Sequence, residues 1–240
     1  MRRRHFFRLC AGGASAAAVP GLLHPSDTVA ERSYGRVRLV NDSGGSLHLD
    51  DLQIGETYLF HYPMAATQCF LIRLDRPADP ATLRTHDGRE YRWQGGVGPE
   101  RSVVAYSAIC AHKMAHPSPV ISYIDYRPEL TTGGAHSGMI ACCAEGSAYD
   151  PRRGCRVLTG PADQPLAAII LEYDAGEDAL FATGTLGGEM FDRFFREFGH
   201  RLMLEYPNQA PDSRVEGAAH VQTLASFTRS VVHCGVSLET

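Results

Sequence analysis

The chain has 240 residues, of which 44% are hydrophobic and 21% charged, and its formal net charge is −4. This ordinary globular composition excludes a disordered protein and a membrane protein with many spans. No basic run follows the first few residues, so nucleic acid is not expected as a partner. The length suffices for one well-packed domain with an extension, or for two small domains.

The N-terminus has the order of regions found in an export signal. Arg2-Arg3-Arg4-His5-Phe6-Phe7-Arg8 resembles a twin-arginine signal, and a weakly apolar run over residues 9–23 follows it. Thr28-Val29-Ala30 offers a cleavage site. The apolar run is short for a spanning helix and is interrupted by Pro20. We therefore expect residues 1–30 to be a cleaved signal and the protein to be periplasmic, with membrane contact only through this segment if it stays attached. The alternative is a chance basic start before a loop.

After this segment, short β-rich runs alternate with Gly, Pro, Asn and Asp, which is typical of an antiparallel all-β domain. The expected strands are Arg36–Val40, Thr57–Tyr62, Gln68–Leu74, Arg89–Trp93, Val103–Ser107, Gly138–Ala141, Ala167–Tyr173 and Ala179–Thr183. Between them, residues 75–89 are expected to be a solvated excursion. Residues 117–135 are expected to be a long functional or partner-facing loop.

From Gly184 the sequence changes character, and we expect residues 184–240 to form a C-terminal helical extension. An apolar stripe at helical spacing predicts one amphipathic helix over residues 189–204. Its apolar members are Met190, Phe191, Phe194, Phe195, Phe198 and Leu202. This face could pack on the β domain or dock a partner subunit, and the sequence leaves both open. No chemical motif is evident after residue 207.

Two short stretches carry candidate iron ligands. Cys110-Ala111-His112 follows an expected strand, and Cys142-Cys143-Ala144-Glu145-Gly146-Ser147 lies about thirty residues later. Ser147-Ala148-Tyr149-Asp150 and Gly160-Pro161 follow the second stretch. Thiolates and imidazoles on two loops are the ligand types of a mixed Cys/His iron–sulfur centre.

These loops resemble those of a Rieske domain, which binds a two-iron, two-sulfide (2Fe–2S) cluster. The resemblance implies an all-β, antiparallel β-sandwich or barrel over residues 31–183, with an inserted cluster-binding subdomain at about 103–166. It implies metal ligands at Cys110, His112, Cys142 and position 145. Cofactor-binding residues would be Ser147 and Tyr149, whose hydroxyls donate hydrogen bonds, and Gly160 with Pro161, which shield the cluster. No residue is expected to be catalytic.

The sequence departs from the family at the second histidine, where Glu145 stands. A carboxylate can bind iron, but it adds negative charge and should lower the reduction potential. Cys143, His116 and His136 are nearby substitutes; Cys143 is sterically awkward beside Cys142, and an extra histidine in such a loop is expected at the surface. The position is therefore filled by Glu145, by a displaced ligand, or by nothing.

Other cysteine positions also depart from the family. The two cysteines that bridge the loops of high-potential Rieske proteins are replaced by Ala115 and Ala144, and Met114 replaces a turn glycine. Of the 7 cysteines, Cys10 lies in the signal and two are candidate ligands. Those that remain can form two disulfides in three pairings, or stay as buried thiols; they are Cys69, Cys143, Cys155 and Cys234.

A narrower resemblance points to the small Rieske subunit of arsenite oxidase. It rests on Tyr62-Pro63 followed by Cys69, on Gly95-Gly96-Val97-Gly98-Pro99, and on Val104-Ala105-Tyr106-Ser107. It implies a periplasmic electron-transfer subunit with a larger, molybdenum-containing redox partner and a soluble c-type cytochrome or cupredoxin as electron acceptor. One alternative is a cluster-free Rieske-fold subunit that binds a partner. Another is the quinol-oxidising subunit of a cytochrome bc-type complex.

Overall fold

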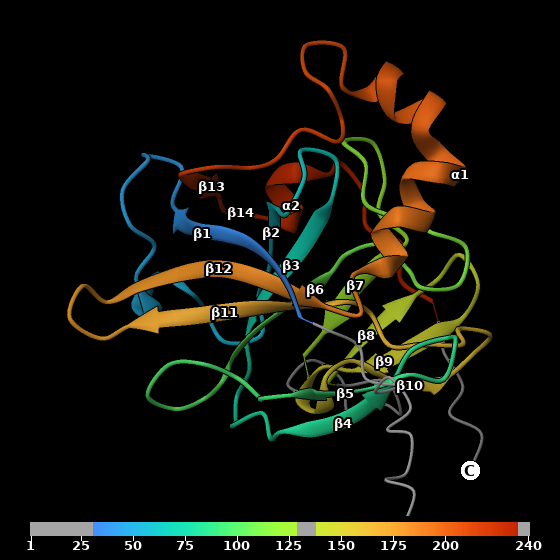
Figure 1. Ribbon diagram of the computed structural model, residues 1–240. Coiled ribbons are helices and arrows are strands. Elements are labelled where there is room, and N and C mark those ends of the chain that lie inside the picture. Colours follow the sequence, from blue (N-terminus) through green and yellow to red (C-terminus); the bar gives the residue numbers. More distant parts are fainter. Residues whose placement is uncertain (1–30, 129–137, 235–240) are drawn as a thin grey trace, which may run out of the picture.

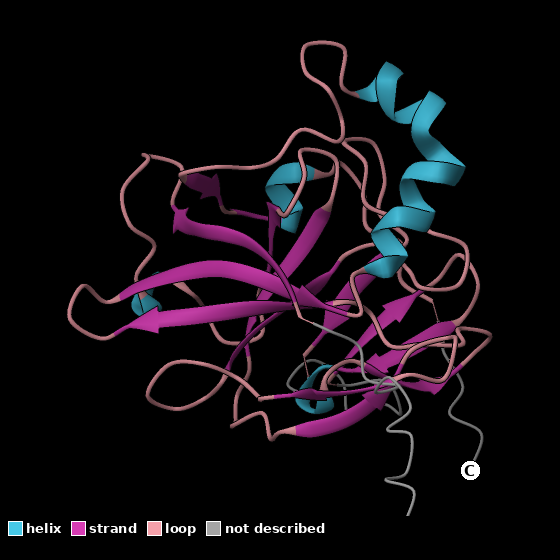
Figure 2. Ribbon diagram, in the orientation of Figure 1, coloured by secondary structure: helices cyan, strands magenta, loops and turns pink. Residues whose placement is uncertain are grey.

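The computed structural model describes residues 31–128 and 138–234, so the expected signal at residues 1–30 lies outside the described part. Strands dominate it, and the prediction of an all-β fold is confirmed (Figures 1 and 2). The strands are β1 (Arg32–Val40), β2 (Thr57–His61), β3 (Gln68–Arg73), β4 (Ala81–Arg84), β5 (Glu90–Trp93), β6 (Val103–Ser107), β7 (Ile124–Arg127), β8 (Met139–Cys142), β9 (Ser147–Asp150), β10 (Arg156–Thr159), β11 (Ala168–Asp174), β12 (Ala179–Leu186), β13 (Ala218–His220) and β14 (Gln222–Thr223). The α-helices are α1 (Glu189–Glu205) and α2 (Leu224–Phe227), and short 3-10 helices cover Leu49–Asp51 and Pro151–Arg153.

The large sheet has the strand order β13-β1-β12-β11-β6-β3-β2-β14. Its first and last strands, β13 and β14, are separated in the chain by Val221 alone. Because β13 pairs with β1 and β14 with β2, one short segment bridges the two ends and curls the sheet into a nearly closed barrel. The segment expected to be a helical extension therefore also supplies two strands.

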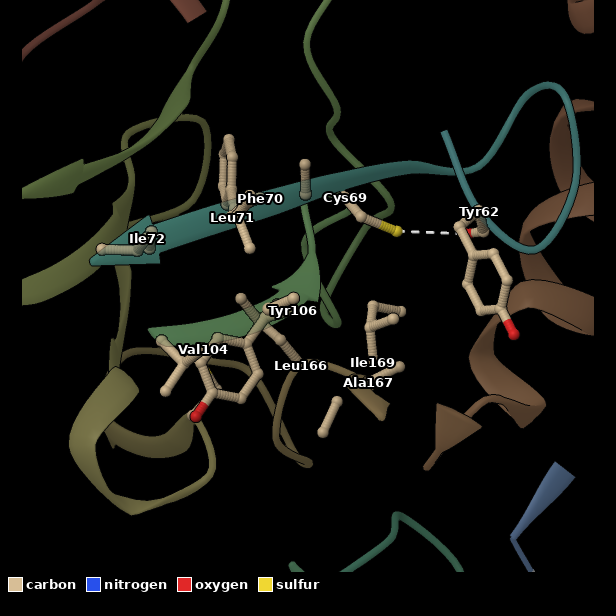
Figure 3. Packing of buried hydrophobic residues seen from close by; sticks show 14 of the residues in the cluster. Tyr62, Cys69, Phe70, Leu71, Ile72, Val104, Tyr106, Leu166, Ala167 and Ile169 are labelled. Atoms are coloured by element: carbon tan, nitrogen blue, oxygen red, sulfur yellow. Dashed lines mark hydrogen bonds between the residues drawn. The ribbon is translucent and has the colours of Figure 1, made fainter. Parts of the chain in front are cut away.

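The core lies inside this curled sheet. Strands β3 and β6 read as near-continuous apolar runs, and their members Phe70, Leu71, Ile72 and Tyr106 are fully buried (Figure 3). The Cys69 thiol is buried among them and donates a hydrogen bond to the Tyr62 carbonyl oxygen at 2.9 Å (Figure 3). Burial raises the pKa of Cys69, so this thiol stays protonated and serves as a core residue.

A second sheet of four short strands, in the order β10-β9-β8-β7, carries the second candidate ligand loop and lies beside the large sheet, whose strand β6 leads into the first (Figure 1). Three features of this region and its surroundings were not expected. β4 lies in the segment predicted to be a solvated excursion, β7 lies in the segment predicted to be a long loop, and β9 with β10 follow the second candidate loop. Each of these strands has four residues, too few to display a period of two clearly.

Helix α1 begins at Glu189, as predicted, and ends one residue beyond the expected end. Its side chains Met190, Phe191, Phe194 and Leu202 are buried in the core of the chain, so most of the apolar face packs on the β domain. Met203 and Leu204, near its C-terminal end, are 66% and 82% exposed. Within the described ranges, no helix combines the length and the apolar character needed to span a membrane.

Candidate metal centre

The first ligand loop follows β6. Its ends are joined by hydrogen bonds from the Cys110 amide to the Ala115 carbonyl (2.8 Å) and from the Met114 amide to the Cys110 carbonyl (3.0 Å). Met114 has a φ of 58°, in the left-handed region that favours the glycine expected here. Its side chain is fully buried, so packing offsets a backbone cost of about 1–2 kcal/mol.

The second ligand loop is the turn of a hairpin. In the register of β8 and β9, Ile140 lies opposite Tyr149 and Cys142 opposite Ser147. The Gly146 amide closes the turn by donating to the Cys142 carbonyl at 2.9 Å. This register places the thiol of one strand and the hydroxyl of the other at the start and end of the same short turn.

The structure places the thiols of Cys110 and Cys142 near enough to each other for their ionisation to be linked. Both are free and fully buried. The pKa of Cys110 is lowered because the Cys142 thiol donates to it, with a further contribution from Tyr149, and the pKa of Cys142 is raised by the same shared proton. Such a pair gives up its first proton readily, which suits binding of a metal by two thiolates.

The buried Tyr149 side chain contacts one sulfur of this pair. Its hydroxyl lies 3.3 Å from the Cys110 sulfur and accepts a hydrogen bond from the Ala111 amide, also at 3.3 Å. Because the amide uses the oxygen as acceptor, the O–H is left to donate to sulfur. Burial raises the pKa of Tyr149, so the hydroxyl keeps its proton for this bond.

The imidazole and the carboxylate form a second pair of donors. His112 Nδ1 lies 3.9 Å from a carboxylate oxygen of Glu145, and the two side chains are 26% and 30% exposed. The other oxygen of Glu145 lies 3.2 Å from Lys113 Nζ, a partner that no motif of the sequence indicates. His112 Nδ1 and Ser147 Oγ are buried and have no hydrogen-bond partner among the described residues.

Gly160 lies against the second ligand loop. Its φ is 93°, and a Cβ atom at this position would come within 2.5 Å of the Gly146 carbonyl oxygen and of the Ser147 Cα. Only glycine permits so close an approach of the two backbones. The Gly160-Pro161 segment, which the resemblance predicts as a shield, therefore lies directly over the turn that carries Glu145.

The proposed substitutes for the missing histidine are differently placed. Cys143 forms a disulfide with Cys234, so the pairing question is resolved for these two, while Cys69 and Cys155 are buried thiols. The expectation of a surface position for His116 was wrong: its side chain is 4% exposed because it packs against α1. His136 lies outside the described residues. Glu145 is thus the described donor beside His112.

The donor set fits a 2Fe–2S cluster with one substitution. In the described part of the chain no three metal-binding side chains converge on a single point. They instead form two pairs, one of sulfur and one of imidazole with carboxylate. A Rieske cluster makes the same division between its two irons, with cysteines on one and other ligands on the second. The unpaired imidazole nitrogen and the unpaired Ser147 hydroxyl are groups that such a cluster would use.

An antiparallel β fold with this pair of loops is similar to that of Rieske-type proteins, the class that the sequence predicts. The chain is similar to the iodate reductase subunit IdrB of Denitromonas iodatirespirans, at 28% identity over 189 residues that cover 78% of this chain and 82% of the relative. A solved structure, the soluble domain of the Rieske protein II (soxF) from Sulfolobus acidocaldarius, matches 62% of this chain and 77% of its own, at 24% identity and a TM-score of 0.45. No protein-family model matches.

Proposed function

We propose that the chain is a periplasmic electron-transfer subunit of an oxidoreductase complex and that it carries a Rieske-type 2Fe–2S cluster. The observation that carries this proposal is the buried pair of free thiols, Cys110 and Cys142, with the Tyr149 hydroxyl on one of them. A relative named as a subunit of iodate reductase supports a larger catalytic partner. The electrons would leave for a soluble carrier, and the signal at residues 1–30 would direct export.

In this proposal Cys110 and Cys142 hold one iron, and His112 and Glu145 hold the other. When bound, the cluster takes up and releases one electron at a time. The Tyr149 hydroxyl stabilises negative charge on the Cys110 sulfur, and Gly160 excludes water by its close approach to the second loop. Lys113 partly balances the charge that Glu145 adds, although its 64% exposure keeps this effect small.

Iron and acid-labile sulfide analysis tests the proposal directly. Protein matured in its native host should contain two irons and two sulfides per chain, and its reduced form should give an EPR spectrum with an average g below that of all-cysteine clusters. Cys110→Ser should abolish both signals, whereas Cys155→Ser, which changes a buried thiol outside the site, should retain them. Iron-free protein from the native host would refute the electron-carrying function.

A cluster-free, partner-binding subunit is the second candidate. One observation favours it: the Glu145 carboxylate already has a cationic partner in Lys113, at 3.2 Å. In that case the chain would co-purify with a larger subunit while containing no iron, and Cys110→Ser would leave the complex intact. The same iron analysis therefore separates the two functions.

A further inference from the structure

Helix α1 contacts the backbone of the first ligand loop beside the candidate ligands. Arg193 donates a hydrogen bond to the His112 carbonyl oxygen at 2.9 Å and a longer one to the Ala111 carbonyl oxygen at 3.5 Å. The guanidinium is oriented by Glu197, one turn along the helix, through a 2.7 Å bond from its Nε. A single side chain of α1 thus fixes the backbone between the first thiol and the imidazole.

The far end of the same loop is held by the aromatic face of α1. The His116 ring meets the rings of Phe194 and Phe198 edge-on, with centroid separations of 5.0 and 5.8 Å. Its Nδ1 lies 2.8 Å from the Met114 carbonyl oxygen, which ties the ring back to the loop. Such buried aromatic pairs restrict the ring to one position, so the loop is anchored at both ends.

The second ligand loop is anchored to the C-terminal tail. Cys143, adjacent to the candidate ligand Cys142, is joined by its disulfide to Cys234, 91 residues later. Arg127 donates to the Cys143 sulfur at 3.1 Å and also to the Cys234 carbonyl oxygen. The tail itself is held by Ser122, whose amide donates to Ser230 and whose carbonyl accepts from Val232, both at 2.9 Å.

We propose that residues 189–234 form a C-terminal clamp that sets the relative position of the two ligand loops. One arm is α1, which holds the first loop through Arg193 and through the rings of Phe194 and Phe198 against His116. The other arm is the Cys143–Cys234 disulfide. Between the arms, β13 and β14 belong to the large sheet. Each loop is therefore positioned against the barrel, and no disulfide joins one loop to the other in the described structure.

Arg193 and the disulfide are positioning groups, and their role in a bound cluster rests on the proposed function. Hydrogen exchange of the full-length chain, followed by mass spectrometry, tests the clamp with or without a cluster. Arg193→Met should speed exchange of the Cys110 and Met114 amides roughly tenfold, because a charge-assisted hydrogen bond restrains their loop. Exchange at Gly146, in the second loop, should stay unchanged.

The double variant C143S/C234S should do the opposite, with faster exchange at Gly146 and unchanged exchange in residues 110–116. Arg196→Met is the matched control, since Arg196 is an exposed arginine of the same helix, and it should alter neither loop. Equal exchange of the first loop in Arg193→Met and Arg196→Met would overturn the inference. So would a uniform increase over the whole chain, because that indicates only lower global stability.

The EPR spectrum of the cluster-containing protein gives a second test of the clamp. Arg193→Met should broaden the EPR lines of the reduced protein, and Arg193→Lys should restore part of the sharpness, since lysine can still donate to the His112 carbonyl. Unchanged line widths in Arg193→Met would count against the clamp. Iron-free protein with the expected exchange pattern would refute the proposed function while supporting the clamp, so the two failures are distinguishable.

Discussion

Replacing Gly160 by alanine should loosen the second ligand loop. The change has two costs: a φ of 93° is unfavourable for alanine, by about 1–2 kcal/mol, and the new Cβ would meet backbone atoms of Gly146 and Ser147 at 2.5 Å. Overlap with backbone atoms costs a further 1–3 kcal/mol or so. We therefore expect Gly160→Ala to lower the free energy of unfolding by about 2–5 kcal/mol.

Gly35 offers a matched control. It has the same φ of 93°, but a Cβ there would have no atom within 4 Å, so Gly35→Ala isolates the backbone cost of about 1–2 kcal/mol. Urea unfolding followed by the fluorescence of Trp93, the single tryptophan and only 5% exposed, measures both variants. If the two variants lost the same stability, the contact between Gly160 and the ligand loop would not constrain the site.

Three further predictions concern single side chains. Glu145→His should raise the reduction potential by about 100 mV, since loss of one ligand charge is worth about 2–3 kcal/mol; an unchanged or lower value in redox titration would exclude Glu145 as a ligand. Tyr149→Phe should lower unfolding free energy by about 1–3 kcal/mol, because the buried Ala111 amide loses its acceptor; unchanged urea unfolding would refute that bond. Burial lowers the pKa of His61 to about 4, so its uncharged form stabilises the fold fully above pH 6.5 and less as the pH falls toward 4. Between pH 7 and 4.5 the wild type should lose about 2.5 kcal/mol more than His61→Gln, and parallel unfolding curves would contradict this.

Strands and the helix that bury a regular apolar face were predictable from consecutive residues. β3 and β6 are near-continuous apolar runs, and the stripe of α1 repeats at helical spacing. In the small sheet β8 was predicted, as Gly138–Ala141, but β7, β9 and β10 were missed. The strand β10, for example, alternates only between exposed and half-buried positions. Its place depends on pairing with β9 rather than on its own pattern.

At the candidate site, the sequence determined which donors are present, because the spacing of Cys110, His112 and Cys142 on two loops is a local property of the chain. It also indicated that Glu145 occupies the place of a histidine. Tertiary structure alone decided how these groups meet: the contact of the Cys110 sulfur with the Tyr149 hydroxyl, the ion pair of Glu145 with Lys113, and the choice of Cys234 as the partner of Cys143. Contacts across 91 residues leave no local trace in the sequence, since they arise only when the closed sheet brings distant segments together.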